Sequence, residues 1–200
     1  MNKTNISLLI PSPDEYNVAA MPNKEEVEEI IKIQGELRSL LGETIWLTSP
    51  NTLHCTLMEI ICNVDYLDKT REEHFLNWYN NYNEITRETI AKSQPFSLTF
   101  NELCVSESAI ILKASNPEPF NSIRQALLGS IKLPTQTKLP PSITHCTIAR
   151  YNQEVNLDKL RVKTADLKPD IRLFIKEFDL MKDLGPDFHP TKLETYNLSK

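Results

Sequence analysis

The stretch "THCTIARY" at residues 144–151 decides the fold, because a shorter version of it, "LHCTL", stands at residues 53–57. Both stretches contain histidine, cysteine, threonine and an aliphatic residue in that order, and their histidines are 91 residues apart (145 − 54). Along a β-strand, alternate side chains point to the same face. Each stretch therefore predicts a strand with a histidine and a threonine on one face and a buried cysteine and aliphatic residue on the other.

Each of these two strands is predicted to end a unit of strand, helix and strand. In the first unit, a strand at 6–10 precedes an amphipathic helix at 24–41. In the second unit, a strand at 109–114 precedes a helix at 117–131. The helix ends 13 residues before the histidine in the first unit (54 − 41) and 14 before it in the second (145 − 131). This matched order predicts an α+β fold with two related lobes about a pseudo-twofold axis.

The other elements follow from hydrophobic periodicity and turn residues. Asn23 and Glu26 predict a capping box at the start of the first helix, and Gly42 predicts its end. The remaining elements are predicted as strands at 44–49, 96–103, 171–181 and 192–198, a helix at 70–92, and a short helix or a turn at 156–167.

The composition favours one globular domain, residues 1–200, that acts on a small partner. Hydrophobic residues make up 40% of the chain and charged residues 24%, which is ordinary for a folded protein. The formal net charge is −5, whereas proteins that grip long nucleic-acid backbones usually present a basic face. We therefore expect a small nucleotide or a short RNA end as substrate, without extensive duplex binding.

The four cysteines, at positions 55, 62, 104 and 146, form no CxxC pair and lie in or beside apolar strand-like runs. We interpret them as small buried hydrophobic residues in a reducing compartment. The chain has no recognisable signal peptide and no apolar run long enough to cross a bilayer. These features predict a cytoplasmic protein without membrane contact, and we expect a monomer.

Two histidines that face each other suit in-line attack on phosphorus. His54 and His145 supply one base for the nucleophile and one acid for the departing oxygen, because the ordinary pKa of histidine, about 6.5, allows one ring to be neutral and the other protonated. Thr56 and Thr147 can donate hydrogen bonds to the phosphoryl oxygens. We expect no metal and no cofactor, because zinc needs a third ligand and even Glu59, the nearest acid to the first motif, has no ligand spacing.

At these residues the chain resembles the 2H phosphoesterase superfamily, whose members carry two His-x-Thr or His-x-Ser motifs. The resemblance covers nearly the whole chain, and "HCTIAR" is similar to the second motif of the bacterial RNA 2′,5′-ligase and cyclic phosphodiesterase group. It implies a bilobal fold with largely antiparallel sheets, flanking helices and an active-site cleft between the lobes. It also implies that His54 and His145 are the acid–base pair and that Thr56 and Thr147 bind phosphate.

The resemblance implies hydrolysis of a cyclic phosphodiester, in a 2′,3′-cyclic nucleotide, an ADP-ribose cyclic phosphate or an RNA end, or of a 2′,5′-phosphodiester. Two alternatives remain: a nucleotide-binding module without turnover, and an RNA ligase or 3′-end trimming exonuclease of the same fold. Four further residues are candidates for substrate binding. Arg150 can meet a second phosphate or serve as a solvated strand-end arginine, Tyr151 and Phe188 can stack a base or fill the core, and His189 can bind substrate or lie on the surface. His74 is expected to be peripheral.

Overall fold

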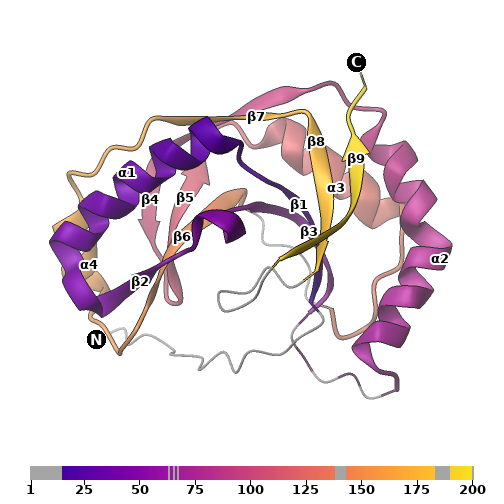
Figure 1. The fold of residues 1–200 in the computed structure, drawn as a ribbon, viewed down its shortest axis with the longest axis horizontal. Helices are drawn as coiled ribbons and strands as arrows, with labels where there is room; N and C mark the ends of the chain where they lie inside the picture. The colour runs from indigo at the N-terminus through magenta and orange to yellow at the C-terminus, as the bar shows by residue number, and fades with distance from the viewer. Residues whose placement is uncertain are drawn as a thin grey trace.

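The computed structural model describes residues 15–62, 64, 66, 68–137, 143–182 and 190–199, which form two antiparallel sheets with packed helices (Figure 1). The first sheet has the strand order β3 (Cys55–Ile61), β1 (Tyr16–Ala20), β8 (Glu177–Lys182) and β9 (Thr191–Asn197). The second has the order β2 (Ile45–Leu47), β6 (His145–Tyr151), β5 (Ala109–Ala114), β4 (Phe96–Val105) and β7 (Ile171–Ile175). The described helices are α1 (Lys24–Leu41), α2 (Arg71–Ile90), α3 (Glu118–Ser130) and α4 (Leu157–Thr164), with one-turn 3₁₀ helices η1 (Gly42–Thr44) and η2 (Pro50–Thr52).

The two sheets repeat one strand order, which confirms the predicted pseudo-twofold relationship. In the first sheet, the histidine strand β3 pairs with β1, and β8 and β9 follow. In the second sheet, the histidine strand β6 pairs with β5, and β4 and β7 follow, while β2 extends the sheet beyond β6. Each unit therefore contributes its first and last strands as an antiparallel pair to its own sheet.

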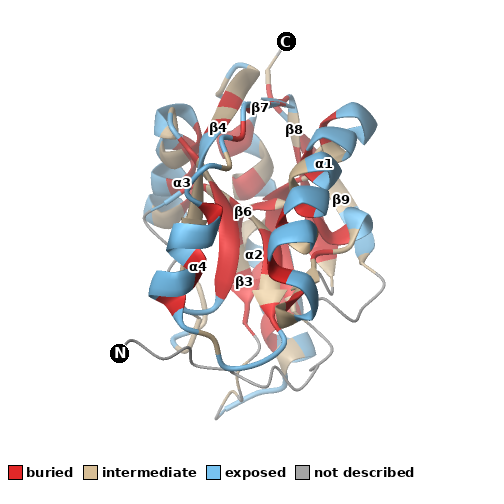
Figure 2. Ribbon diagram, turned by 90° about the vertical axis from the view of Figure 1, so that its left-hand side faces the viewer, coloured by how far each residue is buried: buried red, intermediate tan, exposed pale blue. Residues whose placement is uncertain are grey.

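The helices of the two units are exchanged between the sheets. Helix α1 follows β1 of the first sheet but packs with β7, β2 and β6 of the second, beside α4. Helix α3 follows β5 of the second sheet but packs on β3 of the first, beside α2. Figure 2 shows the buried strands between these helices, whose exposed faces lie outside. The exchange lets each helix reach the motif strand of the other unit.

Local signals at the helix ends account for the accuracy of the helix predictions. Asn23 and Glu26 form the predicted capping box at α1, and Gly42 ends the helix with a positive φ of 56° that favours glycine. Thr70 and Glu73 form a second capping box at α2. No helix in the described part of the chain combines the length and the apolarity that crossing a membrane requires.

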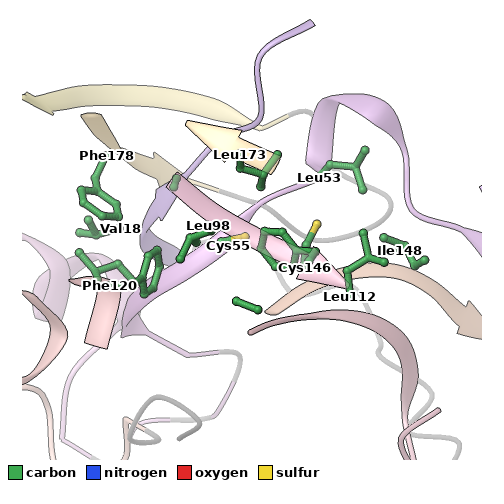
Figure 3. Close-up of a cluster of buried hydrophobic side chains, with 14 of the residues drawn as sticks. Val18, Leu53, Cys55, Leu98, Leu112, Phe120, Cys146, Ile148, Leu173 and Phe178 are labelled. Carbon is green, nitrogen blue, oxygen red and sulfur yellow. The ribbon is translucent and has the colours of Figure 1, made fainter. Parts of the chain in front are cut away.

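One cluster of buried residues joins the two sheets. It contains Val18 and Phe178 from the first sheet and Leu112 and Leu173 from the second, and Figure 3 shows Cys55 and Cys146 among these side chains. The two lobes therefore share one hydrophobic core.

Three predictions about strands and cysteines need correction or fall outside the described residues. The single strand expected at 171–181 breaks at Lys176 into β7 and β8, which belong to different sheets. The strand expected at 6–10 lies outside the described residues, and Tyr16–Ala20, which the sequence reading missed, pairs with β3 instead. Cys104 is half-buried rather than buried, because a register shift in β4 after Phe100 ends the strand's alternation; the other three cysteines are buried as predicted.

Candidate active site

The two motifs occupy matched places at the starts of their strands. His54 immediately precedes β3, and His145 is the first residue of β6. Both histidines and both threonines, Thr56 and Thr147, are half-buried, whereas the cysteine between each pair is fully buried. The predicted division into a polar face and an apolar face is therefore confirmed. We call the polar side of β3 and β6, defined by these four residues, the site face.

The two halves of the site face lie next to each other. Strands β3 and β6 are in contact, and the buried thiols of Cys55 and Cys146 are neighbours. His145 and Arg150 of β6 also act electrostatically on His54. The structure therefore brings the two His-x-Thr motifs together from residues far apart in sequence.

A β-bulge follows the threonine in both motifs. In β3, the pairing with β1 skips Leu57, the residue after Thr56. In β6, the pairing with β5 skips Ile148, the residue after Thr147. An extra residue reverses the alternation of side chains beyond it. The clean alternation predicted from His145 onward is thus wrong after Ile148.

The bulges decide which later residues share the site face. Arg150 and its counterpart Glu59 are half-buried and lie on the same side as the histidines and threonines. Tyr151 instead points into the core, where its hydroxyl donates to the carbonyl oxygens of Ser106 at 2.8 Å and Ala109 at 3.2 Å. The structure therefore brings Arg150 to the site and turns Tyr151 away from it.

Each imidazole is held through the same ring nitrogen. His54 Nδ1 lies 2.7 Å from the carbonyl oxygen of Thr52, and His145 Nδ1 lies 3.4 Å from that of Ile143. Since a carbonyl oxygen only accepts, Nδ1 carries the proton in both bonds. In each neutral ring this leaves Nε2 as the unprotonated nitrogen, which is able to accept a proton.

Burial and neighbouring cations weaken proton binding at both rings. Burial lowers the pKa of His54 most strongly. The hydrogen bond to the Thr52 carbonyl raises it by less, and the charges of His145 and Arg150 lower it further. Burial likewise lowers the pKa of His145, with Arg124 and Arg150 adding to the effect. The hydroxyls of Thr56 and Thr147 have no hydrogen-bond partner among the described residues, so both can donate to a bound group.

A comparison with known families identifies the fold. Residues 69–187 of the chain match the family described as the 2′-5′ RNA ligase superfamily. The chain belongs to this superfamily. The matched region includes the His145 motif and begins after the His54 motif. Among curated protein sequences, none matches the chain.

Solved structures of the same fold align with nearly the whole of this chain. TT0787 of Thermus thermophilus has a TM-score of 0.65 at 16% identity, covering 92% of this chain and 97% of its own. E. coli LigT complexed with 3′-AMP has a TM-score of 0.58 at 17% identity, covering 94% and 100%. The protein of unknown function ATU0111 from Agrobacterium tumefaciens has a TM-score of 0.60 at 14% identity, covering 93% and 87%.

The sequence reading of this superfamily member missed one polar side chain beside the motifs. Asn17 pairs across the sheet with Glu59 and alternates along β1 with residues of the main core, so it lies on the site-face side. Its residue surface is only 6% exposed, and its side chain has no hydrogen bond to any described residue. Two residues before it, Glu15 acts electrostatically on Arg150 of the opposite lobe. The only signal in the sequence was a single amide within the short apolar run "YNVAAM".

Other candidates are placed away from the site or outside the described residues. His74 is buried on α2, where its Nε2 lies 3.1 Å from Asp68 Oδ1. Phe188 and His189 lie outside the described residues. Within the described ranges, no three His, Cys, Asp or Glu side chains gather as a metal site would require.

Proposed function

We propose that the protein is a phosphoesterase that opens a cyclic phosphodiester, or cleaves a 2′,5′-phosphodiester, in a small nucleotide or a short RNA end. One observation carries this proposal. Two imidazoles, each anchored through Nδ1, share a site face with two threonine hydroxyls that have no hydrogen-bond partner among the described residues. Such a set can transfer both protons of a phosphoryl displacement and bind its oxygens without a metal ion.

The chemical step divides between the two rings. The neutral ring accepts a proton at Nε2 from the attacking water, and the protonated ring donates one from Nε2 to the departing ribose oxygen. The P–O bond to the water forms as the P–O bond to the ribose breaks, which leaves a phosphomonoester. Because the charge of His145 lowers the pKa of His54, a proton on His145 disfavours a second proton on His54.

The threonines and Arg150 stabilise the charge on phosphorus. Thr56 and Thr147 donate to the non-bridging oxygens, where negative charge increases in the transition state. Arg150 adds a fixed positive charge from the same strand as Thr147. If a ribose hydroxyl replaces water as the nucleophile, the same groups deprotonate it and protonate the departing ribose oxygen, and the cyclic phosphate becomes a 2′,5′-phosphodiester, so ligation remains an alternative.

Two observations support a nucleotide as the substrate. E. coli LigT, which shares the fold, has been crystallised with 3′-AMP, ATP and NADP⁺. In this chain, Asn17 adds a buried amide with donor and acceptor groups next to Glu59. We infer that Asn17 contacts the nucleoside part of the substrate. Asn17→Leu should raise KM for nucleotides more than it changes kcat, and equal kinetics in wild type and variant would contradict this contact.

The deciding experiment is a substrate panel followed by ³¹P NMR in the presence of EDTA. The panel contains the four 2′,3′-cyclic nucleotides, ADP-ribose 1″,2″-cyclic phosphate, 2′,5′-oligoadenylate and an RNA with a cyclic phosphate end. We expect at least one member to give a monophosphate, and His54→Ala or His145→Ala to abolish this turnover. Tight binding without product would favour a binding module, and activity restored only by zinc would overturn the mechanism.

A single domain, a monomer and a cytoplasmic location remain predictions.

A further inference from the structure

Two buried polar side chains, one on α3 and one on α1, hydrogen-bond to the bulges of the motif strands. Arg124 of α3 donates from Nε to the carbonyl oxygen of Leu57 and from Nη2 to that of Thr56, each at 2.9 Å. Gln34 of α1 donates from Nε2 to the carbonyl oxygen of Ile148 at 2.8 Å. Both residues are only 3% exposed. Each bulge therefore has a buried donor on the carbonyl group of its extra residue.

Each donor comes from the half of the molecule opposite to the bulge that it contacts. Arg124 belongs to the unit of the His145 motif but holds the bulge of the His54 motif. Gln34 belongs to the unit of the His54 motif but holds the bulge of the His145 motif. A second bond of Gln34, 2.8 Å long, goes to the carbonyl oxygen of Thr48 next to β2.

Arg124 also connects to the second motif. Its Nη1 donates to Asn121 Oδ1 at 2.8 Å, and the same oxygen accepts from the hydroxyl of Thr144 at 3.2 Å. Thr144 immediately precedes His145, and the positive charge of Arg124 lowers the pKa of that histidine. One buried guanidinium thus bonds directly to one motif strand and acts on the other.

We propose that Arg124 and Gln34 are positioning residues that fix the threonine-bearing bulges, each from the opposite half of the molecule. This inference rests on the proposed function, because it assigns the two residues to the geometry of that same site. Removing Arg124 takes the side-chain donors from the Leu57 and Thr56 carbonyl groups. Removing Gln34 leaves the Ile148 carbonyl with the backbone N–H of Thr48 as its donor. Each bulge thus loses a buried hydrogen bond that holds it in place, so it shifts. A shift of about 1 Å in a phosphate-binding threonine is enough to lower kcat about 100-fold.

The test compares Arg124→Lys, Arg124→Gln and Gln34→Met with wild type. Lysine keeps the charge but cannot span both carbonyl groups, so we expect kcat to fall about 100-fold while the titration of His145 stays in place. Glutamine at 124 removes the charge, and we expect the same loss of kcat with an upward shift of the His145 titration in ¹⁵N NMR. Gln34→Met should lower kcat without moving that titration. The matched control is Arg161→Gln, which removes an arginine bond from α4 to the carbonyl of Val105 and should change neither quantity.

The readouts separate the failure of this inference from failure of the proposed function. Thermal melts establish that each variant is folded, and Arg124→Lys is the mildest change if glutamine prevents folding. Folded variants with wild-type kcat and an unmoved His145 titration would overturn the inference and leave the function intact. If wild type itself turned over no member of the panel, the proposed function would fail. The His145 titration and the affinity for inorganic phosphate would still test the positioning roles, and wild-type values in all three variants would then overturn them.

Discussion

The thiol of Cys55 neighbours the thiol of Cys146 where the two sheets meet. Each of these cysteines stands between the histidine and the threonine of its own motif. The contact places the two motifs next to each other, because the side chains before and after each cysteine must point to the opposite side of the strand. The repeated cysteine is therefore explained by packing at the junction of the lobes.

This contact predicts a structural rather than a chemical effect of removing the thiols. The neighbouring thiol of Cys146, together with burial, raises the pKa of Cys55 well above its usual range, so Cys55 is not a thiolate near neutral pH. Cys55→Ala combined with Cys146→Ala should lower the free energy of unfolding by about 1–3 kcal/mol, because it empties a packed position. Urea unfolding measures this loss, and the shape of the pH–rate profile should stay the same. A changed profile would assign the thiols a part in the chemistry.

Replacing the threonines tests whether their hydroxyls bind the phosphoryl oxygens. Thr56→Val and Thr147→Val keep the shape of the side chain but remove the donor, so each should lower kcat about 10²–10³-fold. Thr56→Ser and Thr147→Ser retain the donor and serve as controls that should keep most of the activity. Steady-state kinetics decide the matter, and valine variants as active as the serine variants would refute the role.

The lowered histidine pKa values fix the direction of the pH dependence. Activity requires one neutral and one protonated ring, and both pKa values lie below the ordinary value of about 6.5. The bell-shaped profile of kcat/KM should therefore have its maximum below that pH. An optimum well above it would show that the two rings are not the titrating groups.

The same shifts predict that stability falls in acid. Below about pH 6.5 the unfolded chain binds protons on these histidines that the folded chain does not bind. The contribution of the two uncharged histidines to the free energy of unfolding is complete above that pH. It is lost as the pH falls toward their lower pKa values in the folded chain. Thermal melts across this range should show a fall in Tm, and His54→Gln with His145→Gln should reduce its slope.

Arg150 and Tyr151 are neighbours with opposite expected roles. Arg150→Gln should raise KM and lower kcat/KM, because a positive charge next to the phosphate is lost. Tyr151→Phe should leave the kinetics unchanged and lower stability by about 1 kcal/mol, because its hydroxyl bonds only backbone in the core. Kinetics and unfolding of the two variants measure both effects, and a raised KM in Tyr151→Phe would place its ring in the site.

The sequence predicted the helices, the motif strands and the second unit of strand, helix and strand because those features have local signals. It missed the opening strand of the first unit, Tyr16–Ala20. The capping box at Asn23 and the repeated His-x-Thr pattern can be read without knowledge of the fold. The bulges after Thr56 and Thr147 could not be predicted, because they depend on pairing with β1 and β5. That pairing sends Arg150 to the site and Tyr151 to the core, against simple alternation.

The positioning residues had a weaker signal that the sequence reading did not use. Gln34 lies on the apolar stripe of α1 with Ile30 and Leu37, and Arg124 lies between Phe120 and Leu127 on that of α3. A polar residue on an apolar helix face indicates a buried partner. Which carbonyl groups they meet depends on the exchange of α1 and α3 between the sheets, and no pattern within a single helix contains that information.

The most direct measurement is the turnover of the best cyclic nucleotide by wild type, His54→Ala, His145→Ala and the double variant, all in EDTA. If both imidazoles act on one phosphorus atom, each single change should remove about 10²–10⁴-fold of kcat. The kcat of the double variant should be only slightly below that of the less active single variant, because the two groups act as a unit. Full activity in either single variant would contradict a shared site.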